Sequence, residues 1–298
     1  MPAIIIATQG QNNDWRSRKQ KYNTEIIKLS INDDISQARN HLIKNCNTFW
    51  HFVIEPWEYL AETDEISNSL FNSPEVYKAN VLQGDILTKE IRFWHLSKNI
   101  IYENPVYETV KSNGQELGLY LFSQGGKRTI NTIDILNKWQ TKSPLSPDPI
   151  YYRALTELIQ KNWDAFLNYA DLFVHMQKKQ DISYFMTLYY TAMVLCYIKK
   201  DYQKAIQNLS LCIIKNPTMA EFWCLLGDIY YATNEFKKAS CFYDNARLLG
   251  SRRLNKCEFP MEISKYKEYP EKMIAACESS VNNMNVYAAK INKQSQVH

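Results

Sequence analysis

The sequence predicts an α/β unit followed by an all-α unit of helical repeats. Before residue 145, short β-branched and aromatic runs alternate with helical spacing, and after residue 150 the spacing is almost entirely helical. The stretch SPLSPDPI, rich in proline and serine, separates the two parts and is typical of a domain boundary. Tyrosine is abundant, with 20 residues, and glycine is scarce, with 8, which favours helices over an all-β fold. We therefore expect an α/β domain over residues 1–145 and a helical domain over residues 150–298.

The bulk composition restricts the class of protein. A net charge of +4, with 22% charged residues, is too mild to indicate nucleic-acid binding by itself, so we place nucleic acid behind other partners. The first residues, MPAIIIATQG, do not read as a signal peptide, and no apolar run is long enough for a membrane span. The seven cysteines contain no CxxC pair, and four of them lie in helical apolar patterns, which predicts buried thiols in a cytoplasmic protein: Cys196, Cys212, Cys224 and Cys241.

The first part of the chain shows three strand candidates and one helix in strand–helix–strand order. The helix follows Asp33 and Asp34, whose acids suit the positive end of a helix dipole. Strands on either side of a helix pair in parallel through a right-handed crossover. Further extended segments should add antiparallel strands at the edge. The candidates are strands at 3–8, 25–31 and 50–55, a helix at 35–46, and extended segments at 76–96 and 100–110.

Two carboxylates follow the third strand, WHFVIE, at the point where open α/β sheets bind their ligands. Glu55 ends the strand, and Glu58 comes after Pro56 and Trp57. Such a pair is either a functional site or a strand end exposed to solvent.

A basic run, RSRKQK, lies nearer the N-terminus. Its cations could hold a diphosphate directly, or the run is a solvated helix face.

The second part contains an internal repeat of about 34 residues, which is the period of tetratricopeptide repeats. One repeat is marked at Trp223, Gly227, Tyr230, Ala239 and Ala246. One period earlier lie Tyr189, Cys196, Ala205 and Cys212, and Pro217 follows where that repeat should end. Small residues at these positions allow paired helices to approach closely. We expect a degenerate helix pair at 150–178 before these repeats and a weaker third period at 259–292, marked by Ala275 and Ala276.

The order of motifs resembles that of a family-2-like glycosyltransferase of the A-type fold, N-terminally shortened and followed by tetratricopeptide repeats. DDISQARNHLI is similar to the family's stretch of acids and an Ala-Arg-Asn triplet before a helix, and WHFVIEPWE stands at its Asp-x-Asp-Glu element. ILTKEIRFWHLSKNIIYENPVYE is similar to a strand pair that carries an arginine and ends in His-Glu.

This resemblance implies the roles of particular residues. It implies a base at Glu55 or Glu58 and a divalent metal, Mn²⁺ or Mg²⁺, for which Glu55 and Glu108 are the candidate ligands. The nucleotide-sugar donor would then contact Arg16, Arg18, Lys19, Asp34, Arg39, Asn40 and Arg92.

The sequence departs from the family's pattern at the positions of the chemistry. Trp57 occupies the place of the second acid of the Asp-x-Asp element, which makes that motif degenerate, and Tyr107 stands where the family has histidine. The family's first strand and helix also have no counterpart here.

These departures leave two hypotheses. In one, the protein transfers a sugar from a nucleotide sugar to an acceptor docked by the repeats, and Arg and Lys contacts to the diphosphate take the place of the metal. In the other, it is an inactive relative that acts as a binding or scaffold protein, with a protein or peptide partner on the repeats.

Overall fold

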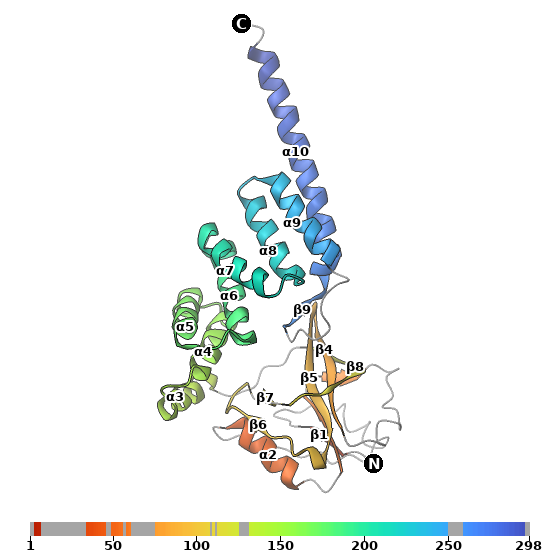
Figure 1. Ribbon diagram of the computed structural model, residues 1–298, viewed down its shortest axis with the longest axis vertical. Coiled ribbons are helices and arrows are strands. Elements are labelled where there is room, and N and C mark those ends of the chain that lie inside the picture. The colour runs from red at the N-terminus through yellow and green to blue at the C-terminus, as the bar shows by residue number, and fades with distance from the viewer. Residues whose placement is uncertain are drawn as a thin grey trace. The chain divides into compact units, whose positions relative to one another are not determined.

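The computed structural model describes residues 3–6, 34–45, 49–55, 58–60, 75–107, 109–110, 112–124, 131–249 and 259–295. The chain divides into two compact units, one of residues 1–156 and one of residues 157–298. The division falls inside helix α4, Asp148–Ile159, a few residues after the proline-rich stretch. The first unit is mixed α/β and the second is helical, as the sequence predicts at this coarse level (Figure 1).

The first unit contains a mixed sheet whose strands follow the order β1-β2-β5-β4-β8-β3. β1 and β2 pair in parallel, which confirms the predicted parallel arrangement for two of the strand candidates, whereas the 25–31 candidate lies outside the described residues. β5 pairs antiparallel with both β2 and β4, and β8 runs parallel to β4 and antiparallel to β3. The bounds are β1 Ala3–Ile6, β2 Trp50–Ile54, β3 Glu58–Leu60, β4 Val76–Gln83, β5 Ile86–His95 and β8 Gln115–Ser123.

β4 and β5 form a hairpin in which Gln83 pairs with Ile86, so the turn consists of Gly84 and Asp85. Gly84 has a φ of +59°, a conformation that glycine adopts without steric cost. The hairpin confirms the predicted antiparallel strands in the 76–96 segment, but β5 and β4 lie in the middle of the strand order, so their predicted place at the edge of the sheet is wrong.

Helix α2, Ile35–Asn45, confirms the predicted helix, and Asp34 caps it. The Asp34 carboxylate accepts from the Ser36 hydroxyl at 2.7 Å and from the Gln37 amide at 3.0 Å. Ile35 and Ile43 are buried, so the helix covers the unit's core with one face.

Two features of the first unit differ from the sequence prediction. The 100–110 segment forms only the short strands β6, Tyr102–Glu103, and β7, Thr109–Val110, which pair with each other in a separate two-stranded sheet. In addition, β8 and helix α3, Thr132–Lys142, were not among the predicted elements. The sequence pattern did not indicate β8 because Gly118 interrupts its run of apolar residues, although Leu119 and Leu121 are buried at alternate positions.

The second unit is built from antiparallel helices that pack on their neighbours in sequence (Figure 1). The 150–178 segment forms two helices, α4 and α5, but most of α4 belongs to the first unit, so their pairing as a repeat stays a prediction. The two marked repeats correspond to α6–α7 and α8–α9. The bounds are α5 Trp163–Met176, α6 Ile182–Val194, the π-helical turn η3 Leu195–Lys199, α7 Tyr202–Lys215, α8 Ala220–Ala232 and α9 Phe236–Leu249.

The predicted third helix pair at 259–292 is wrong. The segment forms the short strand β9, Met261–Glu262, a 3₁₀ turn η5, Ile263–Tyr266, and one long helix α10, Glu268–Ser295. Ala275 and Ala276 both lie within that helix, and no glycine or proline follows them to turn the chain.

Close packing in the helix pairs depends on the small residues that the repeat pattern marks. Ala205 and Ala239 are 34 residues apart, and both are fully buried. A Cβ atom at Gly227 would lie 2.6 Å from Cε1 of Tyr243, so only glycine fits where α8 meets α9. The thiols of Cys196, Cys212 and Cys224 are buried as predicted, whereas Cys241 on α9 is exposed, which corrects the prediction for that residue.

Candidate functional site

The carboxyl end of β2 and the start of β3 bring Glu55 and Glu58 together in a tight turn. The Glu58 amide donates to the Glu55 carbonyl at 3.0 Å, and the Glu55 amide donates to the Glu58 carboxylate at 2.9 Å. Glu55 is 7% exposed and Glu58 is 4% exposed. The interpretation of this pair as a solvent-exposed strand end is therefore wrong, because the protein buries both carboxylates.

Two arginines from distant parts of the chain neutralise the buried carboxylates. Arg39, on α2, forms an ion pair with Glu55. Arg92, on β5, donates to Glu58 at 2.7 Å and to the partly exposed Glu90 at 2.8 Å, and its Nη1 lies 3.9 Å from Glu55 Oε1. Arg39 also lies over the Tyr102 ring, 5.0 Å from its centroid. We call Arg39, Glu55, Glu58, Glu90 and Arg92 the strand-end ion network.

Burial and charge act in opposite directions in this network. Burial, the largest influence, raises the pKa of Glu58 above its usual value, and the Arg92 guanidinium opposes that rise. For Arg92, burial alone would lower the pKa, but the carboxylates of Glu90, Glu58 and Glu55 together raise it, so the guanidinium stays charged. Attraction between the arginines and the carboxylates therefore offsets the free-energy cost of removing several charges from water.

This arrangement does not fit the divalent metal that the family resemblance implies. A metal of this kind takes carboxylate oxygens as ligands. Here the carboxylates of Glu55 and Glu58 are each engaged by a guanidinium, and a cation placed between them would also face two positive charges. Among the described residues, no group of three or more His, Cys, Asp or Glu side chains has the arrangement of a metal site.

Two other residues predicted to contact a nucleotide sugar have structural partners. Asp34 caps α2. The Asn40 side chain forms two hydrogen bonds with the backbone of Tyr102, donating to its carbonyl and accepting from its amide, both at 2.8 Å. These contacts fasten α2 to β6. Arg16, Arg18, Lys19, Trp57 and Glu108 lie outside the described residues.

Tyr107, which stands where the family has histidine, lies in an aromatic stack. Its ring is 5.4 Å from that of Tyr152, and the Tyr152 ring also stacks on that of Trp139 at 5.9 Å. Its hydroxyl is 3.2 Å from that of Thr156. Tyr107 has a φ of +54°, a conformation that is uncommon outside glycine.

The helical unit contains a second buried acidic site that the sequence analysis did not identify. Asp228 on α8 is 8% exposed and accepts hydrogen bonds from three tyrosine hydroxyls. Tyr243 of α9 and Tyr269 of α10 each donate at 2.6 Å, and Tyr197 of η3 also donates. Burial, followed by the charge of Asp228, raises the pKa of each of these tyrosines well above its usual value. We call these four residues the Asp228 cluster.

A related contact lies two turns earlier on the same helix. Glu221 is 1% exposed and accepts from the Glu262 amide at 2.9 Å and from the Tyr266 hydroxyl at 2.7 Å. An acid repeated after seven residues on an otherwise apolar helix is the signal that reveals both sites, because residues at this spacing share one face. These contacts hold the segment that precedes α10 against α8.

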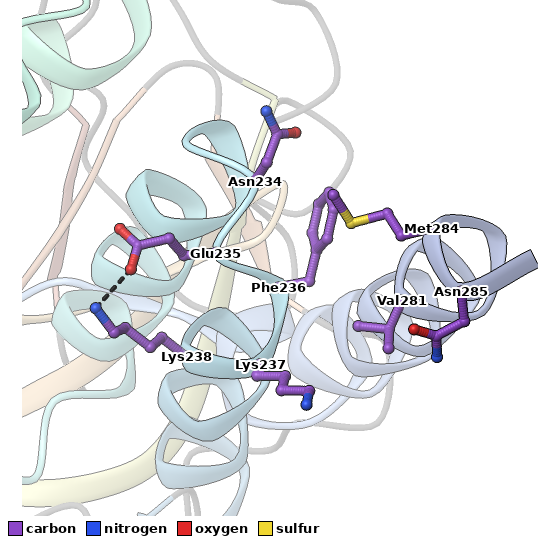
Figure 2. A pocket seen from close by; sticks show the side chains of 8 residues that line it. All are labelled: Asn234, Glu235, Phe236, Lys237, Lys238, Val281, Met284 and Asn285. Carbon is purple, nitrogen blue, oxygen red and sulfur yellow. Dashed lines mark ion pairs between the residues drawn. The ribbon is translucent and has the colours of Figure 1, made fainter. Parts of the chain in front are cut away.

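An open pocket of about 350 Å³ lies between the start of α9 and α10 (Figure 2). Apolar side chains from both helices line it together with polar and charged ones: Phe236, Val281 and Met284, and Asn234, Glu235, Lys237, Lys238 and Asn285. Phe236 meets Val281 and Met284 there, and an ion pair of 2.5 Å joins Glu235 to Lys238 at the rim. This pocket and the strand-end ion network belong to different units.

Comparison with known proteins assigns no family. No family model matches the chain, and no curated protein matches it. Among solved structures, the Sgt2 TPR domain from Aspergillus fumigatus is 11% identical, with a TM-score of 0.36 over 47% of this chain and 81% of that one. MamA from Desulfovibrio magneticus RS-1 is 16% identical, with a TM-score of 0.36 over 51% of this chain and 84% of that one. TarS 1-349 from S. aureus is 8% identical, with a TM-score of 0.30 over 93% of this chain and 91% of that one.

The described part of the chain contains no helix that is both long and apolar enough to cross a membrane.

Proposed function

We propose that this protein is a non-catalytic binding protein. In this proposal the tetratricopeptide-like helical unit docks a protein or peptide partner. The α/β unit is a relative of the glycosyltransferase A-type domain whose strand end has become a structural element. The observation that carries the proposal is the strand-end ion network, in which an arginine holds each of the two buried carboxylates that would serve as base or metal ligand.

The chemistry of sugar transfer supports this interpretation. A general base must reach the acceptor hydroxyl directly or through one water molecule. Glu55 and Glu58 are almost inaccessible to solvent, and each carboxylate is bound to a guanidinium, so neither is placed to reach an acceptor hydroxyl. Asp34 and Asn40, two further residues expected to contact the donor, are engaged in fastening α2.

The helical unit supplies a surface that a partner could cover. α7 buries Ala205, Leu209 and Cys212 completely. On its outer side, Leu211 is 47% exposed and Ile214 is 80% exposed. The two residues are three positions apart, so their side chains are neighbours on one face of the helix. A pair of large exposed apolar side chains on a rigid repeat is a reasonable anchor for a partner peptide.

Two measurements test the proposal. Thermal melting in the presence of nucleotide sugars, with and without Mn²⁺, should show no stabilisation. An assay of nucleotide-sugar hydrolysis and transfer under the same conditions should show no turnover. Selection from a peptide library should yield ligands that bind the wild-type protein and bind Ile214→Glu at least tenfold more weakly. Nucleotide-sugar turnover, or peptide binding that ignores the substitution, would contradict it.

A second candidate, metal-independent sugar transfer, rests on one observation. Glu58 lies beside the carboxyl end of the parallel β1–β2 pair, and its pKa is raised, as suits a group that exchanges a proton. If this candidate is right, Glu58→Gln abolishes transfer from a nucleotide sugar while the protein keeps its fold by circular dichroism.

A further inference from the structure

A strap of residues 259–266 precedes α10 and packs on α6 and α8. It contains β9 and η5 and no α-helix. Its two ends, Phe259 and Tyr266, are 3% and 7% exposed. Between them, Ile263 is 41% exposed and Glu262 is half-buried. The strap is therefore buried at its ends, while its middle is in contact with solvent.

An aromatic ring fixes the first end of the strap. The Phe259 ring meets the Tyr189 ring of α6 at 5.8 Å and the Phe222 ring of α8 at 5.3 Å, edge to face in both cases. Contacts of this kind depend on the orientation of the rings. The space between α6 and α8 therefore favours an aromatic side chain over an aliphatic one.

Polar groups of the same two helices bind the rest of the strap. The Tyr189 hydroxyl donates to the Glu262 carboxylate at 2.8 Å, and the Glu221 carboxylate accepts from the Glu262 amide at 2.9 Å. The Cys224 thiol donates to the Lys265 carbonyl, with 3.5 Å between sulfur and oxygen. Main-chain hydrogen bonds combined with sites for particular side chains are the means by which proteins bind extended peptides.

The surface under the strap is complementary to a peptide with these features. Burial, followed by the charges of Glu262 and Glu221, raises the pKa of Tyr189 well above its usual value, so its hydroxyl stays a hydrogen-bond donor. Phe222 is fully buried and Glu221 is 1% exposed. Departure of the strap would take from these groups a ring, a carboxylate and an amide that now contact them.

The strap can leave this surface without detaching α10. Cys277 of α10 packs with Ala239 and Tyr243 of α9, and the Tyr269 hydroxyl donates to Asp228 of α8. These contacts lie beyond the end of the strap. They hold α10 on its neighbours whether or not the strap is in place.

We propose that the strap is an internal ligand, which a peptide from a partner protein displaces from α6 and α8. The partner peptide is extended and carries an aromatic residue followed three positions later by an acid, as Phe259 and Glu262 are spaced. Because the strap belongs to the same chain, it competes at a high effective concentration, and only a peptide with better contacts replaces it. This surface is separate from Leu211 and Ile214 of α7, so the inference does not rest on the docking proposed there.

Peptide binding to the full chain tests the proposal. The probe is a synthetic peptide with the sequence of residues 258–267, EFPMEISKYK. Phe259→Ala, which lacks the ring of the strap, should bind this peptide at least tenfold more tightly than the wild-type protein in fluorescence anisotropy. A peptide with alanine in place of the phenylalanine is the control and should not bind. A folded Phe259→Ala protein that binds neither peptide, or both equally, would overturn the proposal.

Two further measurements do not depend on the folding of Phe259→Ala. Glu262→Ala changes only a half-buried side chain and should also bind the probe more tightly than the wild-type protein. In the wild-type protein, about 1 mM peptide should speed hydrogen exchange of the Glu262 amide, because displacement breaks its bond to Glu221. Unchanged exchange would show that the strap is a permanent part of the core and would overturn the proposal. Ile214→Glu should leave this exchange result as it is, so the two proposals can fail separately.

Discussion

The ring of Tyr243 occupies the space that any side chain at Gly227 would need. A Cβ atom at position 227 would lie within 2.9 Å of three atoms of that ring. Tyr243 cannot easily move away, because its hydroxyl is held by Asp228 at 2.6 Å. The contact between α8 and α9 is therefore fixed by one glycine, one aromatic ring and one carboxylate.

Gly227→Ala should destabilise the helical unit. Overpacking of this kind costs about 1–3 kcal/mol, which exceeds the gain of about 1 kcal/mol from replacing glycine in a helix. We expect the free energy of unfolding in urea to fall by up to about 2 kcal/mol. Gly118→Ala is the control, since a Cβ there meets no atom within 4 Å. Equal stability of the wild-type protein and Gly227→Ala would show that the helices separate more easily than the structure indicates.

Arg92→Met should destabilise the α/β unit strongly. It removes the guanidinium that contacts Glu58, Glu90 and Glu55 and leaves buried carboxylates without that charge. Breaking a buried ion pair in this way costs about 3–5 kcal/mol. Adding Glu58→Gln to Arg92→Met should recover part of the loss, which a double-mutant cycle measured by urea unfolding would reveal.

The exposed pair of Lys89 and Glu116 provides the comparison for that experiment. Its two atoms are 2.6 Å apart, but the side chains are 29% and 54% exposed. Lys89→Met should therefore cost no more than about 1 kcal/mol. Similar losses for Arg92→Met and Lys89→Met would mean that water reaches the strand-end ion network.

The Asp228 cluster should make the helical unit sensitive to alkaline pH. The folded protein holds the protons of Tyr197, Tyr243 and Tyr269 more tightly than the unfolded chain does, because their pKa values are raised. The stability that this provides is complete below the pKa of a free tyrosine, about 10, and is lost as the pH rises above it.

Tyr243→Phe tests this dependence. At pH 7 it should lower the free energy of unfolding by about 1.5–3 kcal/mol, since it removes a hydrogen bond to a charged group. Between pH 9 and 11, roughly the range in which free tyrosine ionises, the variant should lose stability less steeply than the wild-type protein. Parallel curves for the two proteins would show that Tyr243 does not contribute to the alkaline transition.

The cysteines of the helical unit should differ in reactivity. Burial raises the pKa of Cys196 to about 11 and that of Cys212 to about 12, and the thiolate is the reactive form. Cys241 is exposed. Brief alkylation at pH 8, followed by peptide mass spectrometry, should label Cys241 well before Cys196 and Cys212. Equal labelling of the three in the absence of denaturant would contradict the packing of η3 and α7.

The helix pairs could be predicted from the sequence because their signals are local and repeated. Gly227, Ala239 and Ala205 are small for a packing reason that recurs at the same spacing. Where the sequence lacked a turn signal, the prediction was wrong, and the expected third pair is the single helix α10.

The candidate site could be predicted only in part. The strand and its two carboxylates follow from a local pattern, but their arginine partners do not. Arg39 reaches Glu55 because α2 packs on the sheet, and Arg92 reaches both carboxylates because β5 pairs with β2. The sequence places these residues up to 53 positions apart and contains no signal of that pairing. The predicted roles of Glu55 and Glu58 in chemistry stay predictions.

The Asp228 cluster also determines how the helical unit comes apart. Arrays of repeats usually unfold with nearest-neighbour coupling, so that a terminal helix can fray alone. Here a single carboxylate on α8 is shared by hydroxyls from η3, α9 and α10. Detaching α10 removes Tyr269 from a buried charge and weakens the site that the other two tyrosines share. The unfolding of α10 is thus coupled to that of the other helices. Calorimetry should therefore show one sharp transition for the helical unit, where an array without this coupling would unfold gradually.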